Sequence, residues 1–151
     1  MGATVGKLLG IQSATKGGLG TSFLEGPQGL HVGALAVVNA FGDVVDPETG
    51  TILAGARRDP DSHEFINTVA MLRQGIVRTR FAEPNTTIGV VATNARLTRE
   101  QAQKVAQMGH NALARTIRPV HTLFDGDTVF VLARPEVDAD LHVVGVLAEA
   151  A

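Results

Sequence analysis

"NTTIGVVATNA", residues 85–95, places an Asn and two hydroxyl residues directly in front of an apolar, β-branched run. Val, Ile and Thr favour strands and Asn favours turns, so residues 87–93 are predicted to form a short buried strand entered through a polar turn. Asn85-Thr86-Thr87 also matches the N-x-[ST] glycosylation acceptor, but that interpretation requires secretion. The simple alternative is a turn that leads into a Thr-rich strand.

The elements around this strand alternate between helix and strand patterns. Thr98 and Gln101 have the spacing of a capping box for a helix that runs to about Arg115. Residues 127–134, "DTVFVLAR", are predicted to form the next strand, and another helix is expected to begin after Asp138. This alternation predicts an α/β fold.

Strand and turn patterns dominate the first half of the chain. Residues 21–25 and 30–40, separated by "GPQG", predict an antiparallel hairpin, and residues 44–45 and 52–53 predict a second strand pair. Residues 61–75 favour a helix with Asp61 and Glu64 as its capping box and Gly75 as its end. Residues 1–20 hold six glycines and are expected to form a loop.

Composition bounds the class of protein. The 151 residues suit one domain, and 13 Lys+Arg against 15 Asp+Glu offer no basic surface for nucleic acid. The absence of Cys excludes thiol nucleophiles and disulfides, and the five histidines, at 31, 63, 110, 121 and 142, lack metal-ligand spacing. Neither a signal-peptide pattern nor a long apolar run is present, so we expect a cytoplasmic protein without a metal, cofactor or membrane partner.

The hydroxyl of Thr86 is a candidate nucleophile. A Thr hydroxyl is weak by itself, but it is activated when Thr is the first residue of a chain, because its own α-amine then acts as the base. An α-amine has a pKa of about 7.7 to 8.0, whereas a Lys amine at about 10.4 would be protonated at working pH. Creating that terminus inside this chain requires cleavage of the Asn85–Thr86 bond.

Five motifs together carry a family resemblance. They are "GATVGK" (2–7), "KGGLGTS" (16–22), "VGALAVVNAFGDVVDPETGTILAGA" (32–56), "NTTIGVVATNA" (85–95) and "FDGDTVFVLA" (124–133). In this order they resemble the DmpA-type peptidase family, especially its nylon-oligomer endo-hydrolase (NylC) branch. Members of the family are N-terminal-nucleophile hydrolases that cleave their own precursor and then hydrolyse amides. "GATVGK" is not a phosphate loop, since it lacks the required spacing and the hydroxyl after Lys.

The resemblance implies an αββα sandwich, of which this chain is expected to be a hydrolase domain or its C-terminal portion. It implies self-cleavage after Asn85 into residues 1–85, part of a larger subunit, and residues 86–151, a smaller subunit. Thr86 would be the nucleophile, with Lys7 and Asn39 as partners from the larger subunit and Asp125 and Asp127 from the smaller one. It also implies a homo-oligomeric aminopeptidase or amidohydrolase acting on small peptides or amino-amide oligomers.

Each partner has a chemical role and a plainer alternative. An Asn39 amide donor and the Lys7 charge would steady an oxyanion, and one such donor contributes about 3 to 4 kcal/mol. Asp125 and Asp127 would hold the Thr86 hydroxyl and ammonium, because side chains at i and i+2 of an extended segment point the same way. The alternatives are an Asn closing a strand, an exposed Lys and a solvated acidic turn.

Two functions other than amide hydrolysis also remain open from the sequence. One is an acyltransferase of the ornithine acetyltransferase type, and the other is an inactive structural fragment of the same fold. The sequence does not select among α-peptides, β-peptides and ω-amino-acid oligomers as substrates.

Overall fold

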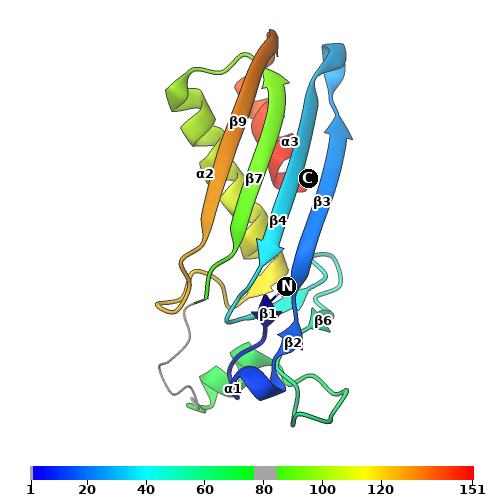
Figure 1. Ribbon diagram of the computed structural model, residues 1–151, viewed down its shortest axis with the longest axis vertical. Helices are drawn as coiled ribbons and strands as arrows, with labels where there is room; N and C mark the ends of the chain where they lie inside the picture. Colours follow the sequence, from blue (N-terminus) through cyan, green and yellow to red (C-terminus); the bar gives the residue numbers. More distant parts are fainter. Residues whose placement is uncertain (1, 77–84) are drawn as a thin grey trace. The chain divides into compact units, whose positions relative to one another are not determined.

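The computed structural model describes residues 2–76 and 85–151, which fall into two units (Figure 1). The first unit is built from Met1–Gly18, Val37–Thr87 and Leu113–Asp127. The second unit is built from Leu19–Ala36, Ile88–Ala112 and Thr128–Ala151.

A four-stranded sheet forms the centre of the second unit. Its order is β3-β4-β7-β9, with bounds Gly18–Glu25, His31–Val38, Ile88–Ala95 and Thr128–Val137. β3 and β4 are joined by a short connection that contains a 3-10 turn, η2 (Pro27–Gly29), so they form the predicted antiparallel hairpin (Figure 1). β7 and β9 are parallel, as a helical crossover requires.

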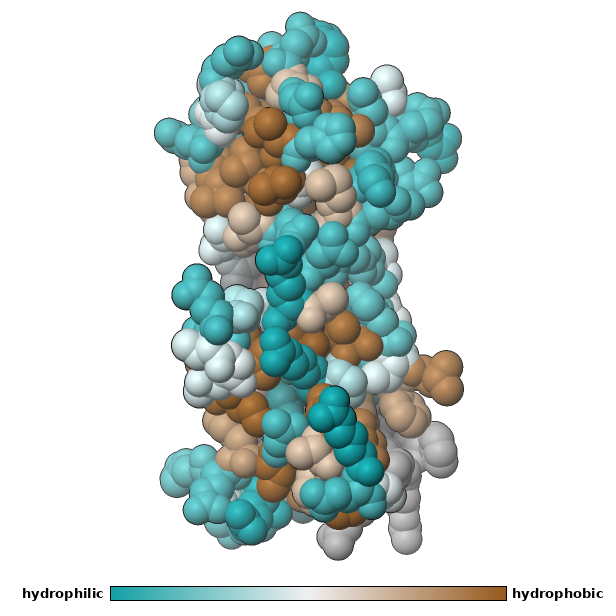
Figure 2. Space-filling view, turned by 180° about the vertical axis from the view of Figure 1, so that it is seen from behind, coloured by the Kyte–Doolittle hydropathy of each residue, from teal (hydrophilic) through white to brown (hydrophobic). Residues whose placement is uncertain are grey.

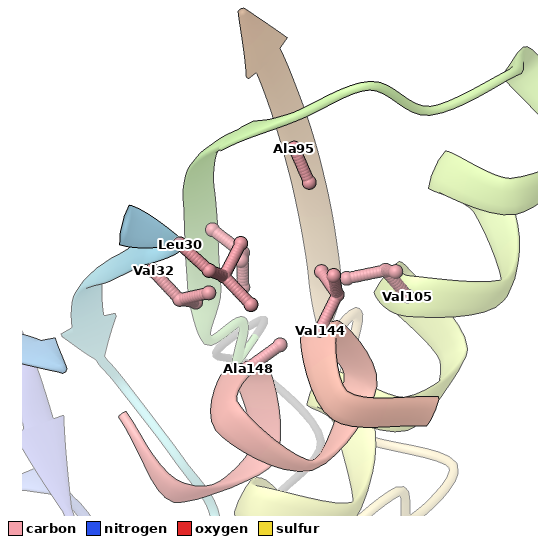
Figure 3. Packing of buried hydrophobic residues seen from close by; sticks show 7 residues of the cluster. Leu30, Val32, Ala95, Val105, Val144 and Ala148 are labelled. Atoms are coloured by element: carbon pink, nitrogen blue, oxygen red, sulfur yellow. The ribbon is translucent and has the colours of Figure 1, made fainter. Parts of the chain in front are cut away.

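Helices cover one face of this sheet. α2 (Arg99–Thr116) lies between β7 and β9 in the chain, and α3 (Leu141–Ala150) follows β9. Along β7 the buried and exposed positions alternate, and the buried face packs on both helices (Figure 3). The buried side chains between the sheet and the helices form a hydrophobic core that contains Leu30, Val32, Val91, Ala95, Val105, Val144 and Ala148.

The opposite side of the sheet keeps large apolar side chains exposed, namely Leu19, Phe23, Leu35, Ile88, Phe130 and Leu132. On the helix side, hydrophobic side chains also gather on the surface, as Figure 2 shows from behind. Val146 of α3 is one of these exposed residues.

The predicted capping box of the long helix is confirmed. Thr98 N donates to Gln101 Oε1 at 2.8 Å, and Gln101 N donates back to Thr98 Oγ1 at 3.3 Å. This reciprocal pair satisfies two backbone groups that a helix start leaves unpaired. The predicted strands at 87–93 and 127–134 correspond to β7 and β9, and the last predicted helix is α3.

The first unit contains two small sheets. β1 (Thr4–Val5) pairs with β2 (Thr15–Lys16), and the second sheet has the order β6-β5-β8, with bounds Ile52–Ala54, Asp43–Val45 and Ile117–Arg118. β5 and β6 are antiparallel, which confirms the second predicted strand pair. Between β1 and β2 lies a short 3-10 turn, η1 (Ile11–Ser13), so the expectation of a loop over residues 1–20 is only partly right.

The predicted helix over residues 61–75 is wrong in its first half. The helix α1 spans Thr68–Arg73, and its N-cap is Asn67, whose side chain accepts a hydrogen bond from Ala70 N at 2.9 Å. Glu64 does not cap it: its carbonyl oxygen accepts from Arg58 N at 3.0 Å, so the backbone at Glu64 is bonded outside the helix, and its carboxylate accepts from Arg58 Nε at 2.9 Å. Asn67, three residues later, is among the residues that cap helices best, and the helix begins after it.

A buried carboxylate joins β5 to the start of α1. Asp43 is 2% exposed, and its Oδ1 accepts from Ala56 N at 3.0 Å and from Thr68 Oγ1 at 2.8 Å. Its Oδ2 accepts from Thr68 N at 2.8 Å. Burial raises the pKa of Asp43 although these three hydrogen bonds favour the ionised form and lower it.

Replacing Asp43 by Asn is expected to destabilise the chain by about 1 to 3 kcal/mol, because the new amide NH₂ faces a backbone donor. A carboxyl whose pKa is raised on folding stabilises most below its unfolded pKa, 3.8, and this contribution is lost as the pH rises through its folded pKa. The deficit of the variant should therefore be larger near pH 4 than near pH 7. Urea unfolding at both pH values measures this, with the exposed Asp138→Asn as the control; a deficit that grows with pH contradicts it.

Candidate active site

Two segments of the first unit that lead into β7 and β9 lie side by side. Asn85 forms an isolated parallel bridge with Asp125, and Thr87 N donates to Asp127 Oδ1 at 2.8 Å. The residue between these two pairs, Thr86, therefore faces the glycine between the two acids. The NTT segment (residues 85–87) thus lies against the DGD segment (residues 125–127), because the two segments pair in parallel register.

The carbonyl of Asn85 is the centre of this arrangement. It accepts a hydrogen bond from Thr86 Oγ1 at 2.6 Å and another from Gly126 N at 2.8 Å. Thr86 N, on the other side of the same peptide bond, donates to the carbonyl oxygen of Asn39 at 2.9 Å. A side-chain hydroxyl and a backbone N–H therefore both donate to one carbonyl oxygen.

Gly126 leaves room for this contact. A Cβ at that position would lie 3.0 Å from Thr86 Oγ1, tighter than nine in ten real Cβ contacts, so the hydroxyl would have to move by a few tenths of an ångström. No sequence motif points to Gly126. The only signal was its place between two acids, which by itself indicates a turn.

Lys7 is buried, so the alternative of an exposed surface lysine is wrong. Lys7 is 6% exposed. Its Nζ donates to Asn39 Oδ1 at 2.7 Å and to Asn85 Oδ1 at 2.6 Å. The ammonium thus links the residue before the candidate nucleophile to the end of β4. Burial of a lysine is costly unless it is hydrogen-bonded, which these contacts provide.

Gly6 allows the chain to bring Lys7 to this position. Its φ is +71°, and a Cβ there would lie 1.9 Å from Ala56 N, so no other residue fits. Beyond it, Lys7 N donates to Phe41 O at 3.0 Å.

Asn39 follows directly after β4, as predicted. Its Oδ1 accepts from Lys7 Nζ and also from Thr4 N at 3.1 Å, and these two donors fix the orientation of the amide. Among the residues that the structure describes, nothing accepts a hydrogen bond from its Nδ2. The half-buried amide therefore keeps a donor available.

The carboxylates of the two acids accept hydrogen bonds mainly from backbone N–H groups. Asp125 Oδ1 accepts from Phe41 N at 3.1 Å, and its Oδ2 accepts from Thr122 N at 3.0 Å and Thr122 Oγ1 at 2.7 Å. The Asp127 side chain is 3% exposed, which excludes the solvated-turn alternative for this acid. Within the described ranges neither carboxylate is hydrogen-bonded to Thr86 Oγ1 in the uncleaved chain.

His121 was missed from the sequence and contacts this site. Its Nδ1 lies 3.0 Å from Asp127 Oδ2, and its side chain is 43% exposed. Six positions separate the two residues, a distance that matches no local motif. The contact forms because the turn at His121 folds back on Asp127, which is visible only in the structure.

Three other kinds of feature are relevant in the described part of the chain: metal sites, membrane-spanning helices and pockets. Residues 2–76 and 85–151 contain no group of three His, Asp or Glu side chains placed to hold a metal ion, and no helix long and apolar enough to cross a membrane. The first unit has pockets of about 680, 420 and 280 Å³, whose lining residues do not include Thr86.

Comparison with known protein families and curated proteins gives one consistent result. The model of peptidase family S58 matches residues 1–149. An uncharacterized aminopeptidase of Mycobacterium leprae (strain TN) is 44% identical over 144 residues, covering 92% of this chain and 38% of the relative. A 6-aminohexanoate-oligomer endohydrolase of Kocuria sp. (strain KY2) is 39% identical over 118 residues, covering 72% of this chain and 31% of that protein. The chain thus spans less than two fifths of the length of these relatives.

Solved structures agree on the fold. A beta-aminopeptidase of Burkholderia sp. superposes with a TM-score of 0.58 at 17% identity, over 97% of this chain and 40% of that one. An l-aminopeptidase d-ala-esterase/amidase from Ochrobactrum anthropi, described as a variant of the Ntn hydrolase fold, gives 0.53 at 15% identity, over 96% and 39%. The predicted α/β fold of the DmpA type, present here in part, is confirmed. With the family model matching nearly its whole length, this chain belongs to peptidase family S58.

Proposed function

We propose that the chain is the self-processing part of an N-terminal-threonine amide hydrolase, cleaved between Asn85 and Thr86 into residues 1–85 and 86–151. One observation carries this proposal: the Thr86 hydroxyl and the Gly126 N–H both donate to the Asn85 carbonyl, at 2.6 and 2.8 Å. A hydroxyl group and a backbone N–H donor beside the same peptide bond support self-cleavage there, with Thr86 as the nucleophile and the Gly126 N–H as the oxyanion donor.

The first stage is an N-to-O acyl shift. Thr86 Oγ1 bonds to the Asn85 carbonyl carbon, the bond from that carbon to Thr86 N breaks, and the hydroxyl proton ends on the nitrogen. The Gly126 N–H stabilises the negative oxygen that forms in between. Water then hydrolyses the ester, leaving a carboxylate on Asn85 and restoring the Thr86 hydroxyl beside a free α-amine.

The second stage acts on a substrate amide. The Thr86 α-amine removes the hydroxyl proton, and Oγ1 attacks the substrate carbonyl and releases its amine, forming an ester that water cleaves. We assign the oxyanion contacts to Asn39 Nδ2, which has no acceptor among the described residues, and to the Lys7 ammonium nearby. Asp127 keeps the Thr87 N–H in place, and Asp125 ties its own segment to Phe41 and Thr122.

The names of the relatives support a substrate class. Proteins matched by this chain are named as aminopeptidases or as a 6-aminohexanoate-oligomer endohydrolase. We therefore propose small peptides or amino-amide oligomers, held by the whole protein rather than by this chain alone.

Intact mass and N-terminal sequencing of the purified protein test the first stage. The expected result is loss of the 15.8 kDa chain and a new terminus that reads "TTIGVV". A chain that stays whole, or a new terminus at Thr87, contradicts the assignment. Acyl transfer to an added amine in preference to water would favour the acyltransferase alternative for the second stage.

Substituting Gly126 by Ala is expected to slow self-cleavage by roughly 100-fold, since the new methyl group displaces the hydroxyl from the Asn85 carbonyl. The time course of cleavage on a denaturing gel measures this effect. Gly20→Ala is the matched control, because a Cβ at Gly20 meets nothing within 4 Å. Equal rates for the two variants would show that the contact with Gly126 is irrelevant to cleavage.

A further inference from the structure

A chain of contacts leads from His121 to the residue after the nucleophile. His121 Nδ1 lies 3.0 Å from one oxygen of Asp127, and the other oxygen accepts from Thr87 N at 2.8 Å. With its side chain 3% exposed, Asp127 is oriented by these protein contacts and hardly by water. Whatever holds Asp127 therefore also holds the backbone at Thr87.

The backbone at His121 is built for this contact. Its φ is +53°, in the left-handed region that residues other than Gly seldom adopt. Among those residues, His, Asn and Asp are found there most often. The next residue, Thr122, binds Asp125 Oδ2 through both its N–H and its hydroxyl. One turn, His121-Thr122, thus holds both acids of the DGD segment.

In the His121–Asp127 pair the histidine is exposed and the carboxylate is buried, whereas both partners of an ordinary surface pair are exposed. The chain contains such a pair for comparison: His142 Nδ1 lies 3.2 Å from Asp140 Oδ1 at the start of α3, with side chains 91% and 66% exposed. Pairs of that kind contribute little. At His121 the partner is buried and is itself hydrogen-bonded beside the nucleophile.

We propose that His121 is a positioning residue: its Nδ1–H holds Asp127, Asp127 holds Thr87 N–H, and the Thr86 hydroxyl is thereby kept against the Asn85 carbonyl. The effect on rate rests on the self-cleavage proposed above, whereas the effect on the Thr87 amide does not.

Two substitutions separate the donor from the backbone shape. Asn at position 121 tolerates a positive φ and places Nδ2 close to where the His Nδ1 lies, whereas Gly tolerates the same φ without a donor. We expect His121→Gly to slow self-cleavage roughly 10- to 100-fold and His121→Asn to stay within about 3-fold of the unsubstituted chain. His142→Gly, at the exposed pair, should leave the rate unchanged. Equal rates for the Gly and Asn variants at position 121 would overturn the proposal.

A second measurement does not depend on cleavage. In the Thr86→Ala background, which is expected to stay whole, hydrogen exchange of the Thr87 amide should be faster with His121→Gly and unchanged with His121→Asn. If the unsubstituted chain fails to cleave, the proposed function is wrong and the Thr87 exchange still decides the role of His121. Unaltered exchange in the Gly variant would show that His121 does not hold this amide.

Discussion

Thr86→Ala is expected to abolish self-cleavage and leave one chain of 15.8 kDa, with the rate lowered by at least about 10³-fold. The hydroxyl that lies 2.6 Å from the Asn85 carbonyl is the only part of Thr86 with nucleophilic chemistry before cleavage. Removing it leaves the Gly126 N–H on that carbonyl but nothing to attack it. Intact mass after prolonged incubation measures the result.

Two further substitutions make this test specific. Thr86→Ser keeps a hydroxyl and should still be cleaved at the same bond. Thr87→Val should also be cleaved, because the Thr87 hydroxyl is buried without a hydrogen-bond partner in the described structure and an isosteric apolar side chain costs little there. Loss of cleavage in Thr87→Val together with normal cleavage in Thr86→Ala would move the nucleophile to Thr87.

Lys7→Met is expected to produce the second largest effect, a fall in the cleavage rate of roughly 10²- to 10³-fold. The ammonium holds the side chains of Asn85 and Asn39 together, and Met replaces the aliphatic stem without the donors. Two amide oxygens then lose a donor near the reacting bond. We also expect a loss of stability of about 1 to 3 kcal/mol. Cleavage rate and urea unfolding are measured on the same preparation.

Lys104→Met is the matched control for charge and side-chain shape, because Lys104 is exposed on α2, where Met is also a good helix former. It should be cleaved like the unsubstituted chain. If Lys7→Met is as stable as the control and is cleaved at the same rate, Lys7 has no place in the site.

Local patterns predicted the second unit better than the first. The capping box at Thr98 and Gln101 is contained within four residues and forms as predicted, and the apolar run after Thr87 becomes β7. In the first unit, Glu64 had the right spacing for a cap, but its backbone carbonyl is hydrogen-bonded to Arg58 N, and α1 begins only at Thr68. A cap signal forms a helix only where the backbone that carries it is not already paired with another segment.

The candidate site was only partly predictable. Thr86 followed from residue chemistry, whereas Lys7, Asn39, Asp125 and Asp127 were singled out by family resemblance. The structure brings them together, but with the acids on backbone N–H groups instead of the Thr86 hydroxyl. Gly126 and His121 carried no motif, and both contact this site.

By itself, the sequence determined the alternation of strands and helices, the long capped helix and the place of Thr86 at the entrance of a strand, because periodicity and capping act over a few residues. Only the tertiary structure decided that Gly126 faces Thr86 and that Lys7 reaches Asn85, 78 positions away. Such contacts depend on strand register and on a glycine turn at Gly6, which residue patterns do not encode. Register is set by which faces of distant segments are buried against each other, and that is known only when the whole chain has folded.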